Sequence, residues 1–264
     1  MSDKFNKIYD QSIKNPEKFW GDASEDIFWF KKPTKILNKS NPPFYKWYED
    51  GVTNTCYNAL DIHIDQGNGK RIALIYDSPI TGNKSKLTYE ELKSKVAKFA
   101  GALRSQGAKK GDRIIIYMPM IPEAVIAMLA CARIGAIHSV VFGGFASNEL
   151  ASRIDDSKAK ILVTASCGFE PGRTVEYKPL VDEAIKQANH KIDKMILFQR
   201  SGHEVKLNAA SEVSWDEVTS NAEEIDCVEM SSNEFAYILY TSGTTGTPKG
   251  IVRDIGGHIV ALKW

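Results

Sequence analysis

The sequence predicts an α/β fold, with a parallel sheet that carries helices on both faces. Short apolar runs alternate with helical segments of about 10 to 15 residues, a spacing typical of right-handed crossovers between parallel strands. The runs are continuously apolar, as expected for strands covered on both sides. The length of 264 residues, with 43% hydrophobic and 25% charged residues, fits a globular chain with a substantial core.

The predicted fold begins with an extension over residues 1–70, which is irregular and rich in Asn, Lys, Trp and Pro. We expect this extension to wrap around the core and to dock aromatic side chains on it. These aromatic residues are Trp20, Phe28, Trp29, Trp47 and Tyr48. The α/β unit, residues 71–264, starts with a strand at Ile72–Tyr76. Thr88 and Glu91 then form a capping box, and apolar residues at helical spacing continue to Gly107.

The remaining elements alternate in order. The predicted strands cover Arg113–Tyr117, Ser139–Phe142, Lys160–Thr164, Lys194–Phe198 and Ala236–Tyr240, the last of the sheet. The predicted helices cover Pro122–Ile134, Ser147–Asp156 and Val175–Ala188, with another near Ile255. Ala124 to Phe145 is largely apolar, but it contains Arg133, His138 and a turn near Gly135. A buried helix followed by a buried strand therefore explains it better than a membrane span.

A small polar loop follows the last predicted strand. It consists of Thr241, Ser242, Gly243, Thr244, Thr245, Gly246, Thr247, Pro248, Lys249 and Gly250. Its glycines allow backbone N–H groups to approach a ligand, its hydroxyls add donors, and its lysine adds a mobile charge. The spacing differs from the P-loop pattern, in which a lysine directly follows the second glycine. The loop predicts a phosphate-binding turn; the alternative is a flexible surface loop.

Glycines also follow other predicted strands. Gly143 and Gly144 come after one strand, and Ser166 to Arg173 follows the next. Because ligands of parallel sheets bind beyond the carboxyl ends of the strands, these loops and the Gly/Thr loop predict one nucleotide-sized crevice. Taken alone, Gly143-Gly144 is also consistent with a tight turn, and Arg173 with a solvated charge.

The Gly/Thr loop resembles the AMP-binding signature of the adenylate-forming superfamily at every position. Val141 to Phe145, Ser152 to Asp156 and Glu170 to Arg173 narrow the resemblance to short-chain acyl-CoA synthetases, the acetyl- and propionyl-CoA synthetases. Phe19-Trp20-Gly21 resembles their N-terminal extension. Glu170-Pro171-Gly172-Arg173, Tyr177 to Leu180 and Arg253 look like the propionate branch. The resemblance implies the first part of the large N-terminal domain of an adenylate-forming enzyme.

The resemblance also implies the chemistry and its participants. A short-chain carboxylate, propionate or acetate, attacks the α-phosphorus of ATP, and coenzyme A then displaces AMP from the acyl-adenylate. Lys249 is the implied catalytic residue, and it binds the ATP phosphates together with Thr241, Ser242, Gly243, Thr244, Thr245, Gly246, Thr247 and Gly250. Coenzyme A is implied to contact Gly143, Gly144, Glu170, Pro171, Gly172 and Arg173, whose guanidinium suits the ribose 3′-phosphate. Mg²⁺ is implied as the counterion of ATP.

The family usually continues into further ATP-binding segments and a C-terminal domain with a catalytic lysine, which we expect to be absent from this chain. Residues 1–264 alone are therefore expected not to turn over. An inactive remnant or an interaction module that retains the fold is the alternative function. The choice between acetate and propionate stays open, because the acyl-pocket residues of the family lie further downstream. The oligomeric state also stays open.

The composition and the residue pattern limit which partners and which metal or disulfide sites are expected. The net charge is +1 and no long basic run is present, so we expect no nucleic-acid partner. The N-terminus lacks an apolar segment, which favours a cytoplasmic protein without a membrane partner. Cys56, Cys131, Cys167 and Cys227 are scattered, which favours free thiols over disulfides. The histidines lack metal-ligand spacing, so no metal site is predicted, and His138 is expected to be a satisfied structural residue.

Overall fold

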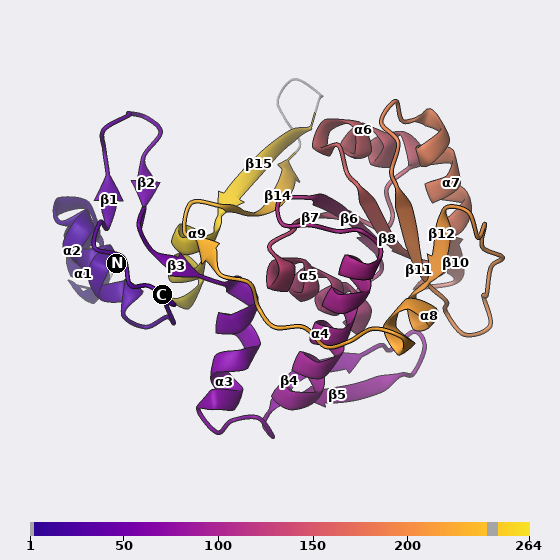
Figure 1. The fold of residues 1–264 in the computed structure, drawn as a ribbon, viewed down its shortest axis with the longest axis horizontal. Coiled ribbons are helices and arrows are strands. Elements are labelled where there is room, and N and C mark those ends of the chain that lie inside the picture. The colour runs from indigo at the N-terminus through magenta and orange to yellow at the C-terminus, as the bar shows by residue number, and fades with distance from the viewer. Residues whose placement is uncertain (1–2, 242–247) are drawn as a thin grey trace.

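A computed structural model describes residues 3–241 and 248–264 (Figure 1). Its centre is a sheet in the order β12-β11-β8-β6-β7-β14-β15. All neighbouring strands pair in parallel, except that β15 runs antiparallel to β14. The strands are β6 (Arg113–Met118), β7 (Ile137–Phe142), β8 (Ile161–Ala165), β11 (Lys194–Phe198), β12 (Glu212–Ser214), β14 (Phe235–Thr241) and β15 (Lys249–Asp254).

Helices cover both faces of this sheet, as the sequence predicts. One face carries α4 (Tyr89–Ser105), α5 (Pro122–Ile134) and α8 (Trp215–Ser220), and the other carries α6 (Ser147–Ser157) and α7 (Tyr177–Gln187).

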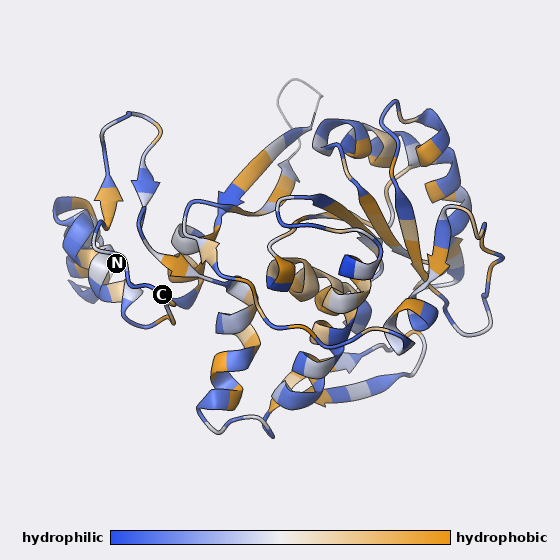
Figure 2. Cartoon of the chain, in the orientation of Figure 1, coloured by the Kyte–Doolittle hydropathy of each residue, from blue (hydrophilic) through white to orange (hydrophobic). Residues whose placement is uncertain are grey.

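Strand β6 shows how one strand serves both faces. Ile114 and Ile116 belong to the core under α4 and α5, whereas Ile115 and Tyr117 belong to the core under α6 and α7. All four side chains are fully buried. The continuous hydrophobic colour of the central strands in Figure 2 follows from this double burial. The α/β prediction is therefore confirmed.

Two strand predictions are wrong in detail. The strand expected at Ile72–Tyr76 is β4 (Ile72–Asp77), but it pairs antiparallel with β5 (Lys84–Thr88) in a separate two-stranded sheet. The connection between these strands is too short for a parallel crossover. The two strands therefore pair as an antiparallel hairpin. The strand expected at Ala236–Tyr240 is not the last of the sheet, because β15 turns back along it.

The N-terminal extension contains more regular structure than its composition suggests. It forms α1 (Asp3–Lys14), α2 (Pro16–Ser24), β1 (Leu37–Asn38), β2 (Lys46–Trp47), β3 (Val52–Thr53), η1 (Tyr57–Asp61) and α3 (Ile62–Asp65). The expectation of an irregular segment is thus wrong at α1 and α2. Helix α1 contains no buried residue, although Phe5, Ile8, Tyr9 and Ile13 recur at helical spacing and are a pattern from which the helix could have been predicted.

Four of the five aromatic residues of the extension pack against the core cluster, as expected. The exception is Phe28, whose ring contacts Phe30 and Tyr57 within the extension itself. Trp29 and Tyr48 are buried in a cluster with Ile255 and Val260 of α9 (Ile255–Lys263). Strand β3 also pairs with β13 (Met230–Ser231). The extension therefore contacts both α9, at the end of the chain, and the segment that leads into β14 (Figure 1). Within the described residues, no helix combines the length and the apolar character needed to cross a bilayer.

Candidate functional site

A cavity of about 320 Å³ opens at the carboxyl ends of four neighbouring strands. Its walls include Met118 to Ile121 after β6, Gly143 and Gly144 after β7, Phe169 and Glu170 after β8, and Arg200 after β11. A loop at the end of β4 closes another side. This is the edge at which parallel sheets bind ligands, and it is the edge at which the strand-end reasoning from the sequence places its predicted crevice.

Tyr177 explains why a glycine is needed at position 143 of the cavity wall. The residue begins α7, and its phenol lies against both Gly143 and Gly168, so that a Cβ at either glycine would collide with it. Burial raises the pKa of Tyr177 to about 12. Gly144 is different, because its Cβ would meet the ring of Phe142, which is largely exposed and free to turn. Gly143 is thus required by packing, and Gly144 is less constrained.

The structure divides the six residues predicted to bind coenzyme A into two groups. Gly143, Gly144 and Glu170 line the cavity. Pro171, Gly172 and Arg173 lie at the tip of the hairpin formed by β9 (Cys167–Glu170) and β10 (Arg173–Glu176), outside the cavity wall. Gly172 has a φ of +76°, as a tight hairpin turn requires. The Arg173 side chain is 71% exposed and pairs with Glu170 at 2.6 Å.

Arg200 lies at the same strand edge, although sequence reasoning did not select it. Its side chain is only 8% exposed, and its guanidinium lies 4.7 Å from the centre of the Phe169 ring. Its backbone N–H donates a 2.8 Å hydrogen bond to the Ser166 hydroxyl. Arg200 stands two residues after the strand Lys194–Phe198. The strand-end rule that selected Gly143 could therefore also have selected Arg200.

Most of the predicted phosphate loop, Ser242 to Thr247, lies outside the described residues. Its two ends are described: Thr241 closes β14, and Lys249 and Gly250 open β15. Thr241 and Lys249 are register partners, and both are exposed. Because β14 runs parallel to β7, Thr241 lies at the sheet edge where Gly143 follows β7. Neither Thr241, Lys249 nor Gly250 lines the cavity described above.

Helix α6 connects the loop after β7 with the end of β14. The Arg153 guanidinium lies 5.0 Å from the centre of the Phe145 ring and 5.4 Å from that of Tyr240. The Tyr240 hydroxyl donates a 2.6 Å hydrogen bond to Asp156. These contacts join two of the predicted ligand loops through a buried cation, a role that the sequence alone did not suggest for Arg153.

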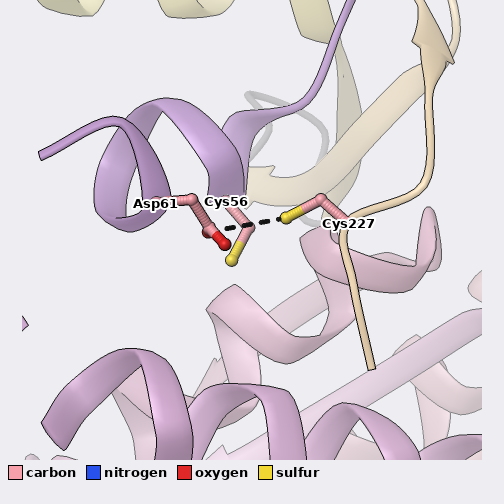
Figure 3. Close-up of side chains that lie close together, drawn as sticks. All are labelled: Cys56, Asp61 and Cys227. Carbon is pink, nitrogen blue, oxygen red and sulfur yellow. Dashed lines mark hydrogen bonds between the residues drawn. The ribbon is translucent and has the colours of Figure 1, made fainter. Parts of the chain in front are cut away.

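A second cluster brings together Cys56, Asp61 and Cys227, with donor atoms that could hold a metal ion within 4.8 Å of one another (Figure 3). Cys227 also donates a weak hydrogen bond to Asp61. The fully buried Arg133 guanidinium donates to Asp61 at 2.8 Å, to Cys227 at 3.1 Å and to Cys56 at 3.5 Å. A cation would have to displace this guanidinium, so we assign the cluster a structural role.

Two family models match the chain. The model "Acetyl-coenzyme A synthetase N-terminus" matches residues 5–59, and the model "AMP-binding enzyme" matches residues 63–263. Among solved structures, the acetoacetyl-CoA synthetase from Streptomyces lividans superposes with a TM-score of 0.86 at 25% sequence identity. That alignment covers 96% of this chain and 38% of the other.

Curated relatives agree with these models. The acyl-CoA synthetase short-chain family member 3, mitochondrial, of Homo sapiens is 54% identical over 254 residues, which are 96% of this chain. The acetyl-coenzyme A synthetase of Streptomyces avermitilis is 43% identical over 98% of this chain. The chain spans only 37% and 39% of the lengths of these two relatives. By its sequence and its fold, the chain belongs to the AMP-binding enzyme family and corresponds to the N-terminal part of its short-chain acyl-CoA synthetases.

Proposed function

We propose that this chain provides the N-terminal, ligand-binding part of an ATP-dependent ligase that joins a short-chain carboxylate to coenzyme A. The observation that carries the proposal is the cavity at the carboxyl edge of the sheet, where Gly143, Gly144 and Glu170 come together. A glycine-walled cavity lets an extended ligand lie against the backbone. The buried Arg200 adds a positive charge that suits a phosphorylated ligand.

The proposed reaction has two half-reactions. In the first, a carboxylate oxygen of the acid attacks the α-phosphorus of ATP, which gives an acyl-adenylate and releases diphosphate. In the second, the thiolate of coenzyme A attacks the acyl carbonyl, which gives the thioester and releases AMP. Displacement at phosphorus depends mainly on positioning and on neutralisation of charge, which backbone N–H groups and cations provide.

Lys249 would neutralise charge on the leaving diphosphate, because it stands exposed at the start of β15 on the sheet edge from which the Gly/Thr loop leaves. Mg²⁺, when bound, would screen the remaining phosphate charge; we assign none of the described residues to it. Propionate or acetate is the proposed acid. The Glu170-Pro171-Gly172-Arg173 hairpin favours propionate by its resemblance to that branch of the family.

Carboxylate-dependent release of diphosphate tests this proposal. The longest translated form of the protein is assayed with ATP and Mg²⁺ against a series of acids from acetate to octanoate, with and without coenzyme A. We expect activity with propionate and acetate, and thioester only when coenzyme A is present. Activity confined to long-chain or aromatic acids would reject the short-chain assignment. Absence of both ATP binding and coenzyme A binding would favour the alternative of an interaction module.

A further inference from the structure

The cavity at the carboxyl edge of the sheet contains an arginine, Arg200, whose guanidinium pairs with neither carboxylate of the cavity wall. The carboxylate of Glu123 interacts with this guanidinium only through space, without a hydrogen bond or an ion pair. Two carboxylates line the cavity, Asp77 and Glu170, and each is paired elsewhere. Asp77 pairs with Lys84 at 2.9 Å, and Glu170 pairs with Arg173 at 2.6 Å. Over residues 3–241 and 248–264, the Arg200 guanidinium makes no hydrogen bond or ion pair with any of these groups or with another side chain.

The burial of Arg200 makes this lack of a partner significant. The residue is more than nine-tenths buried, and buried charges in proteins are normally paired, because desolvation of an isolated ion is costly. The ring of Phe169 under the guanidinium, 4.7 Å away, offsets only part of that cost. The backbone hydrogen bond to Ser166 fixes the position of the residue but does not neutralise its charge. The Arg200 guanidinium therefore remains available to donate hydrogen bonds to an anionic group of a ligand.

The rest of the cavity indicates what kind of molecule carries that anion. Ile80, Met120, Val140 and Phe142 line the same cavity, and all four are exposed apolar side chains. Met120 is 87% exposed and Phe142 is 66% exposed. Exposed apolar groups around a polar centre are typical of ligand sites. The ligand should therefore combine an anionic group with an apolar or planar body.

We propose that Arg200 binds the diphosphate group of coenzyme A in this cavity, while Arg173 at the exposed hairpin tip serves the 3′-phosphate. This inference rests on the proposed function, because that function supplies the ligand. In coenzyme A the diphosphate lies between the nucleoside and the thiol arm, whereas the 3′-phosphate lies on the nucleoside. The buried arginine fits the inner group, and the exposed arginine fits the outer one. A guanidinium can donate to two oxygens of a diphosphate at once.

Isothermal titration of the 264-residue chain with three ligands tests the assignment. Coenzyme A carries both groups, 3′-dephospho-coenzyme A carries only the diphosphate, and pantetheine carries neither. Arg200→Gln should weaken binding of the first two ligands by the same factor, between about tenfold and a hundredfold. Arg173→Gln should weaken binding of coenzyme A only. Arg104→Gln, at an exposed position on α4, is the matched control and should change none of the three affinities.

Arg200→Lys keeps the charge but loses the planar pair of donors, so it should recover part of the affinity that Arg200→Gln loses. If Arg200→Gln bound 3′-dephospho-coenzyme A as tightly as the wild type, the assignment would be wrong. Thermal melting of each variant checks folding. If Arg200→Gln does not fold, Arg200→Lys decides, because the assignment requires it to bind both phosphorylated ligands more weakly than the wild type and pantetheine equally well. Unchanged affinity of Arg200→Lys for 3′-dephospho-coenzyme A would then overturn the assignment.

Failure of the assignment is distinguishable from failure of the proposed function. Diphosphate release by the wild type without coenzyme A tests the ligase assignment alone. A protein that binds coenzyme A through Arg200 but forms no acyl-adenylate would reject the ligase function and keep the binding site. A protein that forms acyl-adenylate and binds 3′-dephospho-coenzyme A independently of Arg200 would reject the Arg200 assignment and keep the function. A wild-type chain that binds neither phosphorylated ligand would overturn the assignment.

Discussion

The buried guanidinium of Arg133 on α5 donates two hydrogen bonds to the carboxylate of Asp61, at 2.8 and 3.0 Å. Asp61 ends η1 in the N-terminal extension, so this ion pair joins the extension to the α/β core. Arg133 also donates to the backbone carbonyl of Ile225 at 2.6 Å. One buried cation thus holds three segments that are far apart in the sequence.

Removal of one partner of this pair should destabilise the protein strongly. Asp61→Ala leaves the fully buried guanidinium with only the exposed carboxylate of Asp226, 4.0 Å away, as a counterion. Loss of one partner of a buried ion pair typically costs about 3–5 kcal/mol in the free energy of unfolding. Urea denaturation at neutral pH measures the change. Asp10→Ala removes a carboxylate from the exposed pair with Lys14 and serves as the control, with an expected change below about 1 kcal/mol. Equal effects of the two substitutions would show that the buried pair has no special role.

Gly143 and Gly144 should respond differently to the same substitution. Gly143→Ala forces a methyl group against the buried Tyr177, which must move and distort the cavity wall. Gly144→Ala meets only the exposed Phe142 ring, which can rotate away. Calorimetric titration with coenzyme A should show at least about tenfold weaker binding for Gly143→Ala and a smaller change for Gly144→Ala. The reverse order would contradict the role of Tyr177 as the support of this loop.

The sequence predicts the elements that have local signals. Helix α5 is correct at both ends, because Pro122 stands at its first turn and Gly135 ends it with a φ of +73°. Strand β15 was missed because it begins at Lys249-Gly250, directly after a proline, and because its residues are largely exposed. A strand that is stabilised mainly by pairing with a neighbouring strand does not need an apolar or alternating sequence, so such a pattern does not predict it.

The part of the candidate site that could be predicted from the sequence is the part that lies directly at the carboxyl ends of the predicted strands. The glycines after strands indicated the sheet edge at which the cavity opens. Arg200, which lines the same cavity, was overlooked because arginine is usually exposed. The cluster around Arg133 could not be predicted, since Cys56 and Cys227 come together only through tertiary folding. The roles assigned to the residues of the Gly/Thr loop stay predictions, because Ser242 to Thr247 lie outside the described residues.

Lys249→Ala should slow adenylation more than it weakens binding of coenzyme A. The lysine is exposed at the end of the Gly/Thr loop and outside the cavity assigned to coenzyme A, so its charge is available for the polyphosphate. Loss of one such contact in a transition state typically slows the reaction about a hundredfold or more. Carboxylate-dependent diphosphate release measures the rate, and Lys191→Ala at another exposed position is the control. Unchanged diphosphate release by Lys249→Ala would assign the lysine a purely structural role.

His138 on β7 should make the stability of the protein depend on pH. Its ring stacks on Tyr237, and its Nδ1 has no hydrogen-bond partner among the described residues, so the expectation of a satisfied histidine is wrong. Burial, with a smaller contribution from the nearby His258, lowers the pKa of His138 to about 4 from an ordinary value of 6.5. Between these values the unfolded chain binds a proton that the folded chain does not. Stability therefore falls as the pH drops from about 6.5 to about 4, by up to about 3 kcal/mol.

His138→Phe isolates this contribution, because it keeps an aromatic ring beside Tyr237 and removes the titrating group. Urea denaturation at pH 7 and at pH 4.5 should show a smaller loss of stability for His138→Phe than for the wild type. Acidic groups such as Asp254, whose pKa is raised by burial, are present in both proteins and cancel in the comparison. His203→Phe, at an exposed turn, is the control and should retain the full loss. An equal decrease in the free energy of unfolding for the wild type and His138→Phe between pH 7 and pH 4.5 would contradict this prediction. His138 would then be protonated as readily in the folded protein as in the unfolded chain.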